Sequence, residues 1–156
     1  MNIRNKTIWT VTDGSEGMIS QVNGIAQLLS SNFINFKTNL FFPWSKLQPG
    51  YLPVYKWIFK HKIDLQNKPD ILISCGRKSI YLSLLLKKIF KEELITIHIQ
   101  DPKIDPKNFN HIIAPKHDAL QGSNIIYSFG AIHQFTKEII ENCNDNMGLK
   151  YSNNLV

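Results

Sequence analysis

The chain has 156 residues and a formal net charge of +6, with 43% hydrophobic and 11% aromatic residues. This length and composition predict one compact domain with a substantial core and exclude a disordered chain. The positive charge favours anionic partners such as phosphorylated small molecules, acidic membrane surfaces or nucleic acid. Because the sequence has no long Lys/Arg tract, helix-turn-helix pattern, zinc-finger spacing or aromatic RNA-binding signature, we predict that it does not bind nucleic acid.

Cysteine usage and targeting signals indicate where the protein works. Cys75 and Cys143 are far apart and lack a close metal-ligand spacing, so we expect free thiols in a reducing compartment and neither a metal nor another cofactor. Residues 1–6 are polar and lead directly into a strand without a signal peptide, and no apolar run reaches the ~18 residues of a membrane-spanning helix. We therefore expect a cytoplasmic protein, with peripheral contact to the inner face of the membrane as an open alternative.

The first elements are a strand, a glycine-containing turn and a helix. Residues 6–12 are rich in β-branched and aromatic side chains, and Asp13-Gly14-Ser15-Glu16-Gly17 follows with turn chemistry. Apolar residues at helical spacing then predict a helix that ends near residues 30–32. The turn lacks a complete G-x-G-x-x-G pattern and has two acids where a pyrophosphate would approach, which argues against dinucleotide binding.

The next part of the chain combines a strand with an aromatic, basic stretch. Residues 33–42 alternate in apolar character, which predicts a second strand that Pro43 stops. Residues 54–62 mix aromatic residues with lysines. This stretch could lie with its aromatic side on an anionic membrane surface. We favour the alternative, a short helix that buries Trp57 and Phe59 and leaves its lysines in solvent.

Residues 69–79 are the most informative stretch, with an apolar run that breaks at Gly76 and continues as Arg77-Lys78-Ser79. The pattern predicts a buried parallel strand, a tight turn and a helix through residue 90. Free N–H groups at the helix start, together with the two cations, would favour an anion. The alternative is an ordinary turn with two solvated cations, and the residues alone do not decide between the two.

Three more strands are predicted in the second half, at residues 94–99, 111–114 and 124–129, followed by a helix over residues 133–142. Strands that alternate with helices predict an α/β fold with a Rossmann-like parallel sheet flanked by helices and connected by right-handed crossovers. His98 falls inside a strand, so we expect it to be a hydrogen-bonded core residue. Residues 144–154 are polar and typical of a linker.

Polar residues follow four of the predicted strands. Parallel strands place their carboxyl ends at one edge of the sheet, which is where open α/β sheets bind ligands. We predict a site there with Asp13, Asp101, His117 or Asp118 as the catalytic base, and His117 next to Asp118 is the best acid/base candidate. A surface pair is an equal alternative for these two neighbours. The predicted substrate-binding residues are Gly14, Glu16, Gly76, Arg77, Lys78, Ser79 and Gln100.

The order of several short motifs resembles the mitochondrial-fission ELM family, whose bacterial members look like GT-B glycosyltransferases. The matching motifs cover nearly the whole chain: Trp9-Thr10-Val11-Thr12-Asp13-Gly14 with Glu16-Gly17 and Gln21, Pro43-Trp44, residues 69–79, Ile99-Gln100-Asp101-Pro102-Lys103, Ala114-Pro115-Lys116-His117-Asp118 and Gly130-Ala131-Ile132-His133. An Arg-Arg-Ser-like turn of the family is present as Arg77-Lys78-Ser79, which exchanges a planar guanidinium for the point charge of Lys78.

The resemblance implies a GT-B-like enzyme with two Rossmann-like domains, of which residues 1–143 would be the N-terminal, acceptor-side domain and residues 144–156 a linker toward a missing C-terminal domain. Such an enzyme transfers a sugar from a nucleotide-sugar donor, bound mainly by the missing domain, to an acceptor that is unknown here, with no obligatory metal. The alternative is a non-catalytic interaction scaffold, because the plant relative is named for a role in recruiting fission machinery and a fold alone does not determine function.

Overall fold

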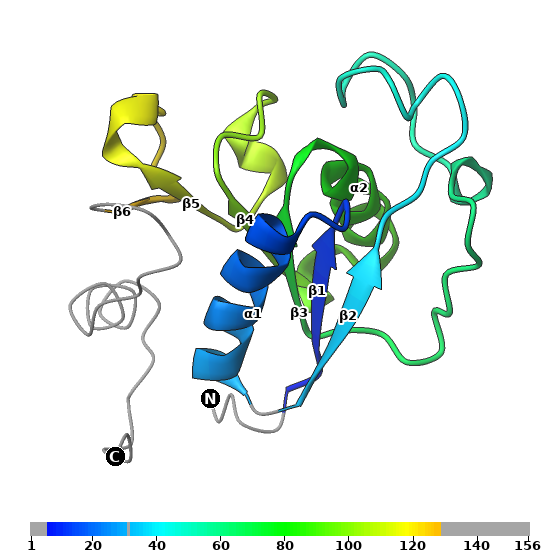
Figure 1. Ribbon diagram of the computed structural model, residues 1–156, viewed down its shortest axis with the longest axis horizontal. Helices are drawn as coiled ribbons and strands as arrows, with labels where there is room; N and C mark the ends of the chain where they lie inside the picture. Colours follow the sequence, from blue (N-terminus) through cyan, green and yellow to red (C-terminus); the bar gives the residue numbers. More distant parts are fainter. Residues whose placement is uncertain (1–5, 31, 129–156) are drawn as a thin grey trace.

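The computed structural model describes residues 6–30 and 32–128. Within them, six parallel strands form one sheet in the order β2-β1-β3-β4-β5-β6 (Figure 1). The predicted α/β fold with a Rossmann-like parallel sheet is therefore confirmed. The strands are β1 (Ile8–Thr12), β2 (Phe33–Lys37), β3 (Ile71–Cys75), β4 (Ile95–Ile99), β5 (His111–Pro115) and β6 (Ile125–Ser128).

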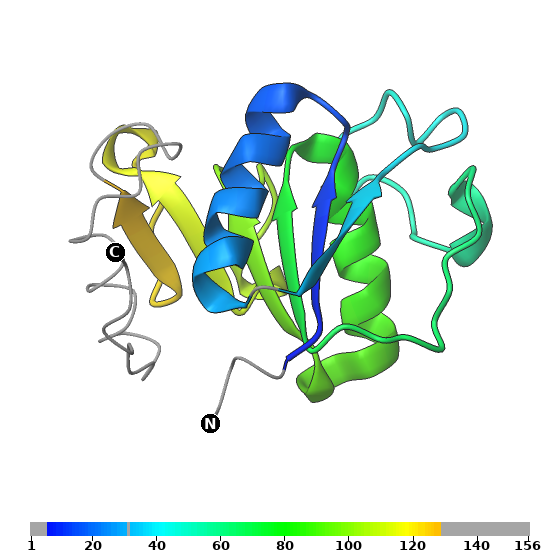
Figure 2. The same ribbon diagram turned by 60° about the horizontal axis from the view of Figure 1, so that its bottom comes forward.

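The two α-helices within the described residues, α1 (Glu16–Leu29) and α2 (Arg77–Phe90), cover opposite faces of the sheet, as Figure 2 shows. Successive side chains of a strand point to opposite faces. Ile71 and Ile73 of β3 therefore pack with Val22 and Ile25 of α1, whereas Leu72 packs in a separate cluster with the apolar side of α2. All five residues of β1 and of β3 are buried, so neither strand has a face exposed to solvent, and the polar side chains Thr10, Thr12 and Ser74 lie in the interior.

Side chains stabilise the two ends of the helices differently. Neither helix has a side-chain hydrogen bond at its N-cap, where Ser15 precedes α1 and Gly76 precedes α2. In the last turn of α2, the charges of Lys87 and Lys88 compensate the negative end of the helix dipole. Of the described helices, none is long and apolar enough to cross a bilayer.

The segment between β2 and β3 differs from the sequence prediction. The strand predicted over residues 33–42 ends at Lys37, and Leu40 instead forms an isolated antiparallel bridge with Phe59. The expected short helix is present as a 3-10 turn over Lys56–Ile58, and Phe59 is buried. The prediction for Trp57 was wrong, because its side chain is 62% exposed while the neighbouring Ile58 fills the core position.

The regular alternation of strands and helices also fails in the second half of the sheet. The connections from β4 to β5 and from β5 to β6 contain only the 3-10 turns Pro106–Asn108 and Lys116–Asp118. Asn124, just before β6, ties the second connection to the first, because its side-chain amide donates to the carbonyls of Pro106 and Phe109, each at 2.9 Å. The helix predicted over residues 133–142 and the linker over 144–156 lie outside the described residues.

Candidate functional site

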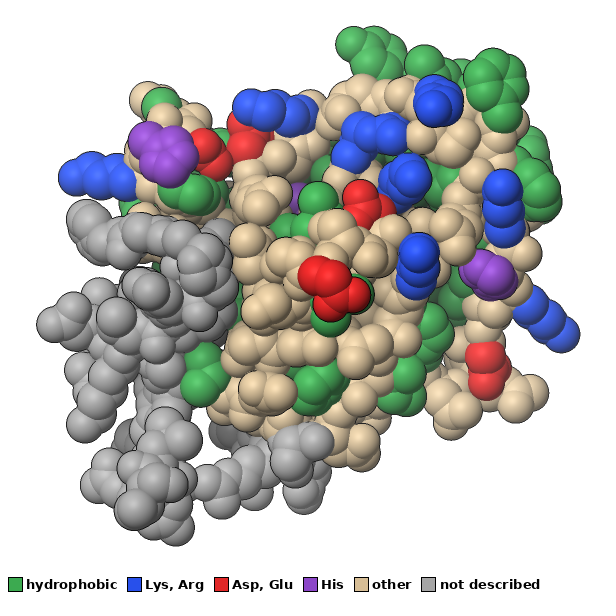
Figure 3. Space-filling view, viewed as in Figure 1, with side chains coloured by type: hydrophobic (Ala, Val, Ile, Leu, Met, Phe, Trp, Pro, Cys, Tyr) green, Lys and Arg blue, Asp and Glu red, His purple; other side chains and the backbone are tan. Residues whose placement is uncertain are grey.

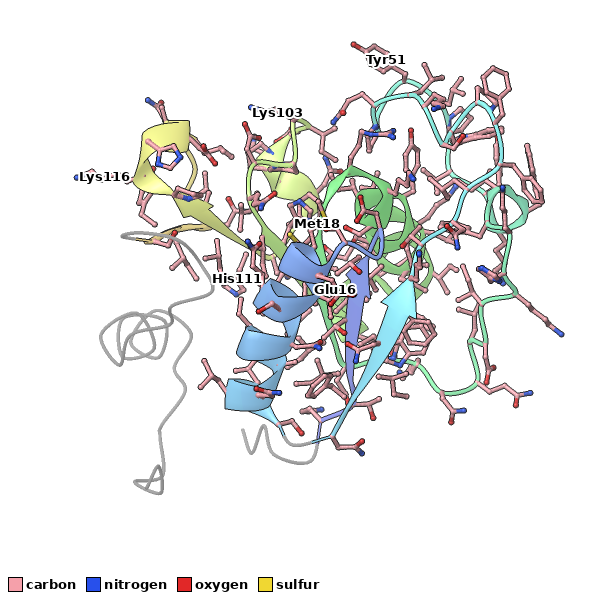
Figure 4. All side chains as sticks on the ribbon, in the orientation of Figure 1. Glu16, Met18, Tyr51, Lys103, His111 and Lys116 are labelled. Atoms are coloured by element: carbon pink, nitrogen blue, oxygen red, sulfur yellow. The ribbon has the colours of Figure 1, made fainter. Side chains whose placement is uncertain are left out.

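The loops after β1, β3, β4 and β5 meet at the carboxyl edge of the sheet, which is the upper edge in Figure 1. Figure 4 places Met18 and Glu16 at the start of α1 and Lys103 in the loop after β4, all at this end of the molecule. Every residue that we predicted for the site lies in one of these loops or in the first turn of a helix that follows one. The topology thus brings the predicted residues to one edge, in two groups.

The first group is built on the turns at Gly14 and Gly76, which have φ values of 96° and 91°. A Cβ atom on Gly76 would lie 2.5 Å from Met18 Sδ and 3.9 Å from Asp13 Cγ, so the turn after β3 packs directly against the start of α1. A Cβ atom on Gly14 would collide with the Lys37 side chain. Both turns favour glycine because of their positive φ values, since the atoms that would collide belong to the flexible ends of side chains. Asp13 lies beside Gly76.

Asp13 is positioned by its own turn, since its carboxylate accepts a hydrogen bond from the Ser15 N–H at 3.1 Å. Glu16, the first residue of α1, is exposed. Its carboxylate stands at the positive end of the helix dipole, where a negative charge is stabilised. Asp13 and Glu16 bring two carboxylates to this part of the edge, and Lys37 lies beside the Gly14 turn.

Gln21 of α1 joins three elements at this edge, although we assigned it no role from the sequence. Its Oε1 atom accepts hydrogen bonds from Cys75 Sγ and from Gln100 Nε2, each at 3.3 Å. Burial raises the pKa of the Cys75 thiol to about 12, and the nearby Asp13 carboxylate adds to the rise. Cys75 is thus a protonated core residue, and Gln100 is held at the edge. The place of Gln21 in a family motif was the one signal that could have indicated this role.

The first turn of α2 uses its side chains mainly within the protein. The Arg77 guanidinium donates to the carbonyls of Leu47 and, at 2.7 Å, of Ser45. Ser79 is fully buried, and its hydroxyl donates to the Gly76 carbonyl at 2.6 Å. Lys78 is half-buried. An anion at this turn would therefore meet Lys78 and the backbone N–H groups first, and the predicted substrate contacts of Arg77 and Ser79 stay predictions.

Replacing Arg77 with lysine is expected to lower the free energy of unfolding by about 1–2 kcal/mol, because an ammonium group cannot reach both carbonyls with the geometry of the guanidinium fork. The positive charge is retained, so the change reports on positioning of the segment that contains Ser45 and Leu47. Urea unfolding measures it, with Lys78→Gln in the same turn as the control, which should shift stability by less than about 0.5 kcal/mol. Equal effects of the two substitutions would contradict this role for Arg77.

The second group lies on the loops after β4 and β5. Asp101 accepts a hydrogen bond from the Lys103 N–H at 2.8 Å and forms an ion pair with Lys103 Nζ at 2.5 Å. Burial by itself would raise the pKa of Asp101, but the hydrogen bonds and charge of Lys103 outweigh it and lower the pKa. His117 Nε2 lies 3.5 Å from an oxygen of Asp118, so these neighbours do point together. The His117 side chain is 82% exposed.

The loop after β4 also has an unusual backbone. Gln100 and Lys103 adopt positive φ values of 78° and 55°. Such conformations cost about 1–3 kcal/mol in a non-glycine residue and persist where the surrounding structure imposes them. Here the Gln100 N–H donates to the Ile113 carbonyl at 2.8 Å, and the Gln48 amide donates to the Pro102 carbonyl at 3.2 Å. These two hydrogen bonds hold the loop in this conformation and thereby fix the positions of Gln100 and Asp101.

His98 lies below the edge and takes no part in it. Its side chain is 1% exposed, its Nδ1 atom is 2.8 Å from Ser74 Oγ, and its ring stacks on Phe109. This geometry agrees with the core role predicted from the sequence. Among residues 6–30 and 32–128, no three His, Cys, Asp or Glu side chains are grouped so that they could hold a metal ion.

Comparison with known proteins places the chain in a family. The sequence profile of the family described as Mitochondrial fission ELM1 matches residues 16–153. The chain belongs to the mitochondrial fission ELM1 family. The match begins at Glu16, so it includes both α-helices and the second group of site residues, whereas Asp13 and Gly14 precede it.

Two proteins with sequence similarity to the chain are longer than it. An uncharacterised protein of Rickettsia prowazekii is 30% identical over 115 residues, which are 71% of this chain and 32% of that protein. The mitochondrial fission protein ELM1 of Arabidopsis thaliana is 30% identical over 53 residues, 34% of this chain and 12% of that protein. The matched part of the chain thus spans about a third of the length of the Rickettsia protein and a smaller share of the Arabidopsis protein. No solved structure matches it.

Proposed function

We propose that this ELM1-family chain is the acceptor-side half of a GT-B-type glycosyltransferase, which moves a sugar from a nucleotide-sugar donor to an acceptor. The observation that carries the proposal is the convergence of Asp13, Gln100 and Asp101 on the carboxyl edge of a Rossmann-like sheet, beside a glycine turn at Gly76 that admits close backbone approach. Ligands of open α/β sheets bind at this edge. The donor would bind mainly on a second Rossmann-like domain.

In the proposed reaction an acceptor hydroxyl attacks the anomeric carbon of the donor, the bond to the nucleoside diphosphate breaks, and a base removes the hydroxyl proton. Asp13 and Asp101 are the carboxylates that we propose for this step. The hydrogen bonds and charge of Lys103 lower the pKa of Asp101, so this carboxylate is ionised but is a weaker base than an unpaired one. His117, paired with Asp118 at 3.5 Å, is the alternative base. Backbone N–H groups at the start of α2 would stabilise the departing diphosphate.

Alanine substitution of Asp13, Asp101, His117 and Asp118, one at a time, is expected to reduce sugar transfer by about 100-fold or more at the residue that acts as base. The assay is release of UDP from UDP-glucose or UDP-N-acetylglucosamine by a protein in which this chain is joined to its donor domain. Asp105→Ala, which removes an exposed carboxylate that caps a neighbouring turn, is the matched control. Activity that survives all four substitutions would exclude the proposed chemistry, and the 156-residue chain alone should turn over little.

A non-catalytic interaction scaffold is the second candidate, and a specific observation favours it. Arg77 and Ser79, the residues best suited to a diphosphate, make hydrogen bonds within the protein. One relative is a mitochondrial fission protein by name. Calorimetric titration with UDP-glucose, UDP-N-acetylglucosamine and GDP-mannose separates the two candidates. Capture of a protein partner without affinity for any nucleotide sugar would favour the scaffold, and saturable nucleotide-sugar binding would favour the enzyme.

A further inference from the structure

The segment between β2 and β3 projects from one corner of the molecule and carries aromatic side chains into solvent (Figures 1 and 3). Phe42, Tyr51 and Trp57 are 81%, 76% and 62% exposed, and Phe41 and Tyr55 are also exposed. We call these five residues and the lysines among them the aromatic-lysine surface. Monomeric proteins seldom expose so many large apolar groups together without a partner.

The charges of this surface have one sign. Residues 38–63 contain four lysines and neither aspartate nor glutamate. The four lysines are exposed: Lys46, Lys56, Lys60 and Lys62. Lys60 Nζ lies 5.8 Å from the centre of the Phe41 ring, so cations and aromatic rings share the same surface. Figure 3 shows hydrophobic and basic side chains gathered at this corner. The surface is therefore complementary to a partner that is both apolar and anionic.

The aromatic side chains are exposed by a well-anchored backbone. The Phe41 N–H donates to the Ile58 carbonyl at 2.9 Å, and Trp44 Nε1 donates to the Pro53 carbonyl at 3.1 Å. Trp57 packs edge-on against buried Trp44, with ring centres 4.9 Å apart, and stacks on Tyr55. Because Trp44 and Ile58 fill the inner positions, Trp57 is held outward. The exposure is built into the packing and costs little ordering entropy when a partner binds.

We propose that the aromatic-lysine surface attaches the protein peripherally to an anionic lipid bilayer. Tyr and Trp rings are suited to the interface between lipid headgroups and acyl chains, and each lysine near an anionic surface contributes attraction. The surface is a projecting corner, which can meet a flat bilayer (Figure 4, Tyr51 at its tip). Single-stranded nucleic acid fits less well, because Arg77 is the one arginine among the described residues and its guanidinium holds the carbonyls of Ser45 and Leu47.

Vesicle co-sedimentation of the purified protein tests the proposal. We expect binding to vesicles of phosphatidylcholine mixed with phosphatidylglycerol, little binding to phosphatidylcholine alone, and loss of binding at high salt. Changing Lys56, Lys60 and Lys62 together to glutamine should weaken binding about 100-fold, at roughly fivefold per charge. The control changes Lys88, Lys91 and Lys107 to glutamine, which removes three exposed charges elsewhere and should preserve most of the binding.

The aromatic contribution has its own readout. Trp9 and Trp44 are 1% and 9% exposed, so a blue shift of tryptophan emission on vesicle addition reports on Trp57. Trp57→Phe should remove the shift and keep most of the binding. Changing Phe42, Tyr51 and Trp57 together to serine should reduce binding more than tenfold, whereas serine at the exposed residues Ile34 and Ile89 should not. Circular dichroism confirms that each variant is folded.

Three outcomes would overturn the proposal. The first is failure of the wild-type protein to bind the anionic vesicles. The second is equal binding by the surface variants and their controls. The third is that a different partner occupies the surface. This would be seen as a dimer in sedimentation velocity, or as retention of single-stranded RNA, that the same substitutions disrupt while the wild-type protein does not bind vesicles. None of these measurements uses a nucleotide sugar, so the result is independent of the proposed glycosyltransferase activity.

Discussion

Replacing Gly76 with alanine is expected to lower the free energy of unfolding by about 1.5–4.5 kcal/mol, the largest effect of any single methyl group that we predict. Gly76 has φ 91° and ψ 156°, a region that only glycine occupies readily, and this conformation alone accounts for about 1–3 kcal/mol. The new Cβ would also lie 2.5 Å from Met18 Sδ. The contact atoms are the flexible end of the Met18 side chain, so moving them to another rotamer adds about 0.5–1.5 kcal/mol. Urea unfolding followed by circular dichroism measures the loss.

Two variants separate the causes. Gly17→Ala adds a Cβ in the first turn of α1, where nothing lies within 4 Å, so it should leave stability unchanged or raise it by up to about 1 kcal/mol. The double variant Met18→Ala/Gly76→Ala should regain the part of the unfolding free energy that Gly76→Ala loses to the contact with Met18, and should keep the loss that comes from backbone strain. If Gly76→Ala is no more destabilising than Gly17→Ala, the close packing of the β3 turn against α1 is wrong. The same contact holds Asp13, so the result also tests the framework of the candidate site.

The stability of the protein is expected to fall steeply in acid because of His98. Burial lowers the pKa of His98 from 6.5 to about 3, although the charge of Asp101 acts weakly in the opposite direction. The His98 side chain therefore takes up a proton near pH 6.5 in the unfolded chain but only near pH 3 in the folded protein. The stabilisation is complete above pH 6.5 and is lost as the pH falls through this window, at about 1.4 kcal/mol per pH unit.

Measuring unfolding free energies of wild-type and His98→Asn proteins from pH 7 to pH 4 tests this expectation. Asparagine retains a polar contact for Ser74 but does not titrate, so the variant should be less stable at pH 7 and should lose less stability per pH unit. Burial alone would raise the pKa of Asp70, but Lys6, Thr7 and Lys68, and not His98, lower it, so Asp70 destabilises both proteins alike at lower pH. His111, whose pKa burial also lowers, is the control site, and His111→Asn should change the slope less because His111 is only half-buried. Parallel pH curves for wild type and His98→Asn would contradict the buried, neutral state of His98.

Physical patterns in the sequence account for most of the sheet. Residues 71–75 and 94–99 are mainly apolar stretches of strand length, and both are central strands covered on two faces. Residues that end such strands must lie at the carboxyl edge once the sheet is parallel, so the loops of the site could be predicted from topology. The prediction over residues 33–42 was less successful, because alternating apolar residues do not show where an edge strand leaves the sheet.

What the sequence by itself determined was the class of fold, the position of five of the six described strands and the glycine turn after β3. These depend on apolar periodicity and on the conformations that a side chain allows, which act between near neighbours. Only the tertiary structure decided that Arg77 holds the carbonyls of Ser45 and Leu47, that Gln21 joins Cys75 to Gln100, and that Trp57 faces solvent while Phe59 is buried. Such partners are backbone carbonyls or side chains brought close by folding from 30 or more residues away in the chain, and nothing in the local sequence marks them.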